Sequence, residues 1–153
     1  GASVSFTSNK NSYSNKIAEY YNFVDKFKGI EFFYDGSIPQ GYDFNIVDLG
    51  ILKEEQLETI KEIADSIVIC GSSTQFEYDD LLNILNSIDG EDKVNLLLSY
   101  SSEKEKNTMK KLLKNNNHKI FFTDDFVGLF DTRDAYIYRQ IIDKYIIENI
   151  LQK

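Results

Sequence analysis

Short apolar runs alternate with longer amphipathic runs along the chain, and this alternation limits the fold to a few architectures. The expected strands are Val4–Thr7, Ile30–Tyr34, Phe44–Asp48, Ser66–Cys70, Val94–Ser99 and Lys119–Thr123. The expected helices are Ser14–Phe27, Glu54–Ala64, Tyr78–Ser87, Glu103–Asn115 and Arg133–Leu151. Strands that alternate with helices are typical of a mainly parallel sheet covered by helices. The sequence therefore predicts a three-layer α/β fold of Rossmann-like type.

Length and composition indicate a globular chain with a core of its own. The 153 residues suit one domain, and we expect residues 1–153 to form a single domain. Hydrophobic residues make up 42% and charged residues 27% of the chain, as in ordinary globular proteins. The formal net charge of -8 argues against a general nucleic-acid surface, which needs clustered Lys and Arg.

Several features bear on location. No apolar stretch reaches the roughly 20 residues that a membrane-spanning helix needs, and no signal-peptide pattern is present. The single cysteine, Cys70, cannot form an internal disulfide and is expected to be buried, as unpaired cysteines often are. We expect a cytoplasmic protein. Because Gly1 stands where an initiator Met would, we also expect a domain excised from a longer protein.

Two segments near the end of the chain have simple interpretations. His118, the only histidine, lies in a polar stretch and is expected to be a loop residue. The last expected helix carries Ile137, Ile141, Tyr145 and Ile146 at helical spacing. Its charged residues are of both signs, which favours packing against the sheet over the basic, amphipathic pattern of a membrane-binding tail.

The link between the second and third expected strands constrains the order of strands in the sheet. Residues 35–41 hold the only proline and two of the eight glycines, so this segment is a turn-rich loop without room for a helix. Parallel neighbours usually need a connection of a dozen or more residues. The two strands are therefore antiparallel neighbours, or they are separated in the sheet, or one of them is misassigned.

Residues 8–16, Ser-Asn-Lys-Asn-Ser-Tyr-Ser-Asn-Lys, lie between the first expected strand and the first expected helix. Many α/β proteins bind phosphate at this position, because free backbone N–H groups and the helix dipole point there. The segment has no glycine, however, and the next glycine after Gly1 is Gly29. A backbone without glycine is poorly suited to close approach to a polyphosphate. An equally valid interpretation is a polar loop in which Ser14 is the helix N-cap.

Three later segments fit the same plan. Asp35 follows the second expected strand, and residues 42–48, Tyr-Asp-Phe-Asn-Ile-Val-Asp, form a strand that ends in Asp48. Residues 64–70, Ala-Asp-Ser-Ile-Val-Ile-Cys, begin the next strand. The order of these segments resembles the MinD and ParA family of P-loop ATPases. That family has a deviant Walker A loop, belongs to the SIMIBI class and includes pilus-assembly and secretion ATPases.

The resemblance implies a role for each residue of the loop. Lys10 falls on the signature lysine of the family loop K-G-G-x-G-K-[ST], and its three glycines are replaced by Asn11, Ser12 and Ser14. Asn15 replaces the lysine that contacts the terminal phosphates. Lys16 replaces the Ser or Thr that ligates magnesium. These six residues are candidate nucleotide contacts in a degenerate site.

The resemblance also assigns the two acidic residues. Asp35 matches the acidic residue that ends the family's second strand, and Asp48 matches the Walker B aspartate that holds a magnesium-bound water. Both are candidate metal residues, if magnesium is bound. The family usually has some fifty or more residues between these two segments, whereas here a short loop joins them. Phosphoryl transfer depends on positioned cations, so the resemblance implies a fold kept without hydrolysis.

Three functional hypotheses follow. The first is a catalytically inactive pseudo-ATPase that serves as a protein-interaction or scaffold module in pilus, secretion or partition machinery, as a monomer or a homodimer. It implies a protein partner, no cofactor, no nucleic acid and no direct membrane insertion. The second is an active ATPase that uses ATP and magnesium, with Lys10 or Lys16 replacing the lost lysine. The third is a receiver-like regulatory domain built on Asp35 and Asp48.

Overall fold

The computed structural model describes residues 2–8, 25–27, 29–74, 77–88, 93–99, 101–114, 118–123 and 135–150. By internal contacts the chain divides into two compact units, residues 1–53 (the first unit) and residues 54–153 (the second unit). Each unit contains parallel strands, and the second unit also has helices on its sheet, so the α/β character predicted from the sequence is confirmed. The expectation of a single domain remains a prediction.

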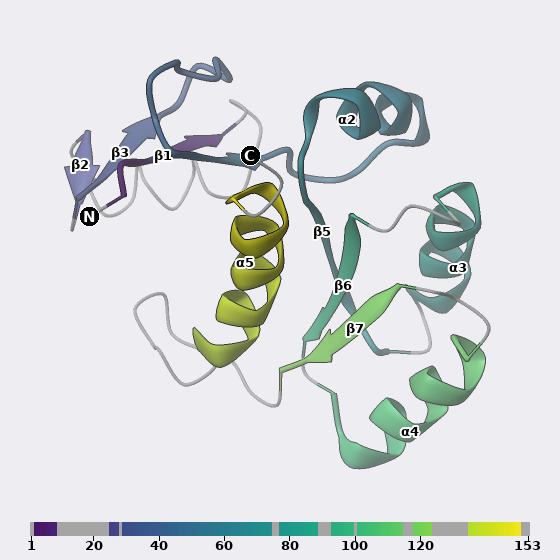
Figure 1. Cartoon of the computed structure of the whole chain (residues 1–153). Helices are drawn as coiled ribbons and strands as arrows, with labels where there is room; N and C mark the ends of the chain where they lie inside the picture. The colour runs from purple at the N-terminus through teal and green to yellow at the C-terminus, as the bar shows by residue number, and fades with distance from the viewer. Residues whose placement is uncertain are drawn as a thin grey trace. The chain divides into compact units, whose positions relative to one another are not determined.

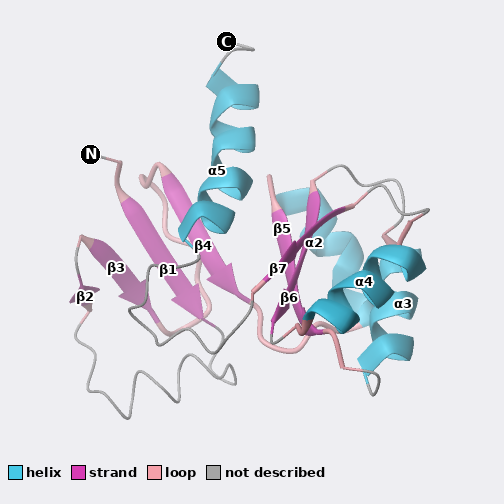
Figure 2. Cartoon of the chain, turned by 90° about the horizontal axis from the view of Figure 1, so that it is seen from below, coloured by secondary structure: helices cyan, strands magenta, loops and turns pink. Residues whose placement is uncertain are grey.

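The first unit is a sheet with the order β2-β3-β1-β4; β2, β3 and β1 are labelled in Figure 1, and all four strands in Figure 2. Its strands are β1 (Val4–Ser8), β2 (Lys26–Phe27), β3 (Ile30–Phe33) and β4 (Phe44–Asp48). β1 pairs in parallel with β3 on one side and with β4 on the other. Of the three arrangements left open for the second and third expected strands, the structure shows the separated one, with β1 between them.

The helix expected at Ser14–Phe27 is wrong in its last three residues, the first of which, Asp25, lies in a bend. Lys26 and Phe27 form β2, which pairs antiparallel with β3. Gly29 has a φ of 87° and so permits the tight reversal between the two strands. Across the pair, the Lys26 ammonium lies 2.9 Å from the Glu31 carboxylate. Residues 14–24 of the expected helix lie outside the described residues.

Residues 34–43 connect the end of β3 to the start of β4. An extended segment of this length reaches about 30 Å, roughly twice the length of a five-residue strand, so it can return along the sheet without a helix. The Thr7 hydroxyl donates to the Ser37 carbonyl at 2.9 Å, and the Tyr42 hydroxyl donates to the Glu31 carboxylate. Thr7 and Glu31 belong to the same face of the sheet by register, and the connection therefore crosses that face.

A polar clasp joins the amino ends of β1 and β4. The Ser3 N–H and hydroxyl both donate to Asp43 Oδ2, at 2.7 and 2.9 Å, and the Asp43 N–H donates to the Ser3 hydroxyl at 3.0 Å. The Phe44 N–H donates to the Ser3 carbonyl at 3.1 Å. These bonds set the register in which Val4 lies opposite Phe44. They also lower the pKa of Asp43, through the backbone bond from Ser3 first and its hydroxyl second.

The second unit is built on a parallel sheet with the order β5-β6-β7. Its strands are β5 (Ile67–Ser72), β6 (Val94–Ser99) and β7 (Lys119–Phe122). Its helices are the 3-10 turn η1 (Glu54–Gln56), α2 (Leu57–Ile63), α3 (Tyr78–Ser87), α4 (Glu103–Leu112) and α5 (Ala135–Ile150). The bounds of β4, β6 and α3 are those expected from the sequence, and the other expected elements outside residues 14–27 differ from the observed ones by up to three residues at an end.

The second unit has three layers. Leu97 of β6 packs with Ile137 and Ile141 of α5, and all three are buried. On the other face of the sheet, a Cβ added at Gly71 would lie 3.6 Å from the Leu98 side chain and 3.9 Å from Leu81 of α3. Figure 2 shows α3 and α4 on one side of the strands and α5 on the other. The predicted packing of the last helix against the sheet is confirmed.

Two single residues differ from the simplest expectation. Cys70, expected to be buried, is exposed. Cys70 lies on the edge strand β5 and, by register, on the same face of the sheet as Leu97. Val68, its neighbour on that face, is exposed too, with an exposed fraction of 40%. His118 lies in a bend, but its side chain is buried, with an exposed fraction of 8%. Among the residues that the structure describes, no helix is long and apolar enough to cross a membrane.

Truncating Leu97 tests the packing of α5 on β6. Leu97→Ala should lower the free energy of unfolding by about 2–5 kcal/mol, because a buried leucine loses its contacts and leaves a cavity. Val68→Ala is the matched control, since Val68 projects from the same face of the neighbouring strand but is partly exposed. Urea unfolding followed by circular dichroism measures both, and equal losses would contradict this packing.

Removing the charge of Asp43 tests the clasp. A carboxyl whose pKa is lowered on folding stabilises the fold above its unfolded pKa, and this contribution is lost as the pH falls through the folded value. The free energy of unfolding should therefore be larger for wild type than for Asp43→Asn at pH 7. This difference should shrink as the pH falls below 3.8, the ordinary pKa of the carboxyl. Asp143→Asn, which removes an exposed carboxyl from α5, is the matched charge control in urea unfolding series across this range.

Candidate functional site

The three parallel strands of the first unit end at the same edge of the sheet, where polar residues gather. Ser8 ends β1, Asp48 ends β4, and Asp35 follows β3 by two residues. Ser8 is fully buried and lies directly opposite Asp48 in the β1–β4 register. The carboxyl edge of a parallel sheet is the usual ligand-binding edge of α/β folds. This edge is therefore the candidate site.

Asp48 closes a turn at the end of its own strand. Its Oδ1 accepts a hydrogen bond of 2.9 Å from the Gly50 N–H, two residues further along the chain. Gly50 has a φ of 71°, a conformation that glycine adopts without strain. A carboxylate that binds the backbone two residues ahead forms an Asx turn. This aspartate thus has a local structural role at the position expected for a magnesium residue.

Asp35 has the same kind of role on the other side of β1. Its Oδ1 accepts from the Ser37 N–H at 2.9 Å and from the Ser37 hydroxyl at 2.6 Å. Gly36, between them, has a φ of 81°. The turn is held at the end of β1 because the Thr7 hydroxyl donates to the Ser37 carbonyl. Both sequence-predicted aspartates are therefore turn residues at the edge of the sheet.

The sheet order sets the separation of the two aspartates. They follow β3 and β4, which lie on opposite sides of β1, so their backbones are two strand spacings apart, about 10 Å. Carboxylates that share a metal ion must bring their oxygens within about 2.5 Å of it. Among the described residues, no group of three or more His, Cys, Asp or Glu is placed to hold a metal ion. To hold a metal ion, the two aspartates would need further ligands from other parts of the chain.

The other predicted contacts cannot be compared with this geometry. Lys10, Asn11, Ser12, Ser14, Asn15 and Lys16 all lie outside the described residues. The strand that precedes them, β1, is described, and it lies beside β4.

A polar cluster on the sheet face of the first unit was not predicted from the sequence. The Glu31 carboxylate accepts from Lys26 and from the Tyr42 hydroxyl. The bond from Lys26, followed by that from Tyr42, lowers the pKa of Glu31. The bond to Glu31 raises the pKa of Tyr42. Tyr42 and Asp43 precede β4 in the family-like motif, and here both anchor the chain as it enters that strand.

The corresponding edge of the second unit is rich in hydroxyl groups, and the two helices that begin there carry acidic residues. Ser73, Ser101 and Thr123 are buried just beyond the ends of β5, β6 and β7. At the start of α3, the Glu77 carboxylate accepts from the Ser72 N–H at 3.0 Å.

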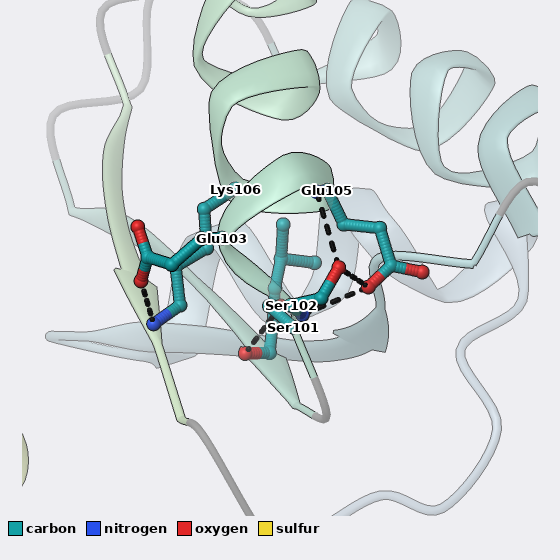
Figure 3. Close-up of polar contacts among 6 residues, drawn as sticks. Ser101, Ser102, Glu103, Glu105 and Lys106 are labelled. Atoms are coloured by element: carbon teal, nitrogen blue, oxygen red, sulfur yellow. Dashed lines mark hydrogen bonds and ion pairs between the residues drawn. The ribbon is translucent and has the colours of Figure 1, made fainter.

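The start of α4 is closed by a capping box, shown in Figure 3. The Ser102 N–H donates to Glu105 Oε2 at 2.8 Å, and the Glu105 N–H donates to the Ser102 hydroxyl at 3.4 Å. The first turns also contain Asp79 and Asp80 in α3 and Glu103 in α4. Carboxylates that occupy a helix N-terminus repel a phosphate there. These two helix starts therefore do not suit a nucleotide.

Comparison with protein-family models, with curated proteins and with solved structures finds no match. The resemblance to MinD and ParA proteins thus rests on the sequence motifs.

Proposed function

We propose that this chain is a catalytically inactive, MinD/ParA-like pseudo-ATPase that serves as a protein-interaction or scaffold module. The setting we propose is an assembly such as pilus, secretion or partition machinery. One observation supports the proposal: the two aspartates that would organise magnesium each accept a backbone hydrogen bond from the turn that follows them. The loop sequence between Ser8 and Ile17 supports it, because glycine is absent there.

The strand arrangement supports the family part of the proposal. In a P-loop domain of this type, the strand before the phosphate loop lies beside the Walker B strand. Here β1 lies beside β4, and Ser8 is opposite Asp48. The same adjacency favours the second candidate, an active ATPase with a non-standard loop, since it would leave Asp48 at the end of the strand next to that loop.

Nucleotide binding separates these two candidates. A ligand at about 100 times its Kd stabilises a fold by about 2.7 kcal/mol, which for a chain of this size raises Tm by about 5–10 °C. We expect no shift of Tm when about 1 mM ATP and magnesium are added to the chain, and no ATP turnover. A shift of this size that is lost in Asp48→Ala, or turnover that is lost in Lys16→Ala, would establish the active alternative.

Two substitutions at Asp48 test its turn role directly. Asp48→Asn keeps the oxygen that accepts from the Gly50 N–H and should leave the stability nearly unchanged. Asp48→Ala removes that acceptor and should cost about 0.5–1.5 kcal/mol in urea unfolding. If instead both variants were as stable as wild type and both lost magnesium-dependent ATP binding in calorimetry, the carboxylate would be a metal residue and the turn incidental.

A further inference from the structure

The outer face of α4 is cationic, although the unit that carries it is acidic. Residues 54–153 contain 19 Asp and Glu and 12 Lys and Arg. Five of these lysines, Lys104, Lys106, Lys110, Lys111 and Lys114, lie within eleven residues that include one acid, Glu105. The positive charge of the second unit is therefore concentrated on one helix and the residues that follow it.

Helical spacing puts part of this charge on a single exposed stripe. Met109 and Leu113 are buried, with exposed fractions of 1% and 2%, and define the inner side. Lys104, Asn107 and Lys111 follow one another at three- and four-residue spacing on the opposite side, and all are exposed. Lys104 and Lys111 are seven residues apart, or about 10 Å along the helix axis.

Both glutamates of α4 accept hydrogen bonds from neighbouring residues. Glu103 forms an ion pair of 2.9 Å with Lys106, and Glu105 closes the capping box with Ser102, on either side of the first turn in Figure 3. Lys110 lies over the Phe122 ring, 5.6 Å from its centroid. Lys104 also contributes to the lowered pKa of Glu105, after the bonds from Ser102, and both Lys104 and Lys111 are exposed to solvent.

We propose that this stripe, defined by Lys104, Asn107 and Lys111, is a docking surface for an acidic segment of a partner protein. In a polyproline II segment, which has three residues per turn and rises about 3.1 Å per residue, carboxylates three residues apart lie on one side and about 9 Å apart, close to the separation of the two lysines. Asn107 lies between them and offers both a donor and an acceptor to the backbone of the partner. Leu112, 49% exposed, borders the stripe and offers an apolar contact.

Other anionic partners fit this surface less well. Residues 104–114 contain neither the arginine nor the aromatic residues that bind phosphate and stack on bases. Of the apolar residues of α4, Met109 is buried and Leu112 is 49% exposed, and a single exposed leucine is too small an apolar face to hold the helix in a bilayer. The net charge of -8 opposes adsorption to a polyanion as a whole. A short acidic segment would instead be attracted by the positive charge of the helix surface alone.

The inference rests on the proposed interaction role, but its test is independent of nucleotide binding. The probe is fluorescein-labelled decaglutamate, and the readout is fluorescence anisotropy with the full chain. We expect saturable binding at about 0.05 M salt that weakens at about 0.3 M, because exposed charges are screened. Lys104→Glu/Lys111→Glu should weaken binding about tenfold or more, and Lys104→Gln/Lys111→Gln should weaken it less.

The matched control is Lys119→Glu/Arg139→Glu, which changes the net charge equally at exposed positions on β7 and α5. It should keep most of the affinity, and circular dichroism should show that every variant folds. Absence of binding, or equal losses in the two charge reversals, would overturn the proposal. So would tighter, stripe-dependent binding of a thymidine oligonucleotide or of phosphatidylserine vesicles. Self-association that the Lys104→Glu/Lys111→Glu variant abolishes would identify a second copy as the occupant, and would also overturn it.

Discussion

The first unit depends on the pairing of β1 with both of its neighbours. β3 and β4 are not hydrogen-bonded to each other, so each reaches the sheet only through β1. Because the three strands are parallel, their carboxyl ends meet at one edge, and every described feature of the candidate site lies there. The clasp between Ser3 and Asp43 fixes the β1–β4 register from the opposite edge. A slip of one residue would turn Asp48 to the other face of the sheet.

The two aspartates show that a residue which stabilises a turn can look like a metal-binding residue in the sequence. An aspartate at the end of a parallel strand is well placed to orient a cation, and it is equally well placed to close the turn that leaves the strand. Asp35 and Asp48 both accept a backbone N–H from two residues ahead, and a glycine with positive φ lies within or ends each turn. This shared geometry gives each aspartate a structural reason to persist without any metal.

Local signals in the sequence predicted the elements well. The alternation of apolar and amphipathic runs located β4, β6 and α3 with the observed bounds, because burial in a sheet or on one helix face leaves a regular pattern. The extent of the first helix was wrong at Lys26 and Phe27, since their pairing with β3 depends on the turn at Gly29 rather than on local propensity. Cys70 was misjudged because residue type alone does not reveal which face of an edge strand is covered.

Such local signals could not predict contacts between residues that are far apart in the sequence. Ser3 and Asp43 are forty residues apart, and neither belongs to a pattern that points to the other. The same holds for Glu31 and Tyr42, which meet because residues 34–43 cross one face of the sheet, whereas Lys26 meets Glu31 through the β2–β3 pairing. The sequence could nevertheless limit the placement of β3 and β4, because the connection was too short to hold a helix. It thereby left the observed order among its three alternatives.

The central position of β1 has a consequence for synthesis of the chain. The ribosome makes this strand before either of its partners, and its partner β4 begins forty residues after it. β1 exposes two unpaired edges until β3 emerges and one until β4 emerges, and such edges can pair with other chains. A chaperone that holds nascent extended segments should therefore matter more for the first unit than for the second, whose central strand emerges after its partner β5 is already complete.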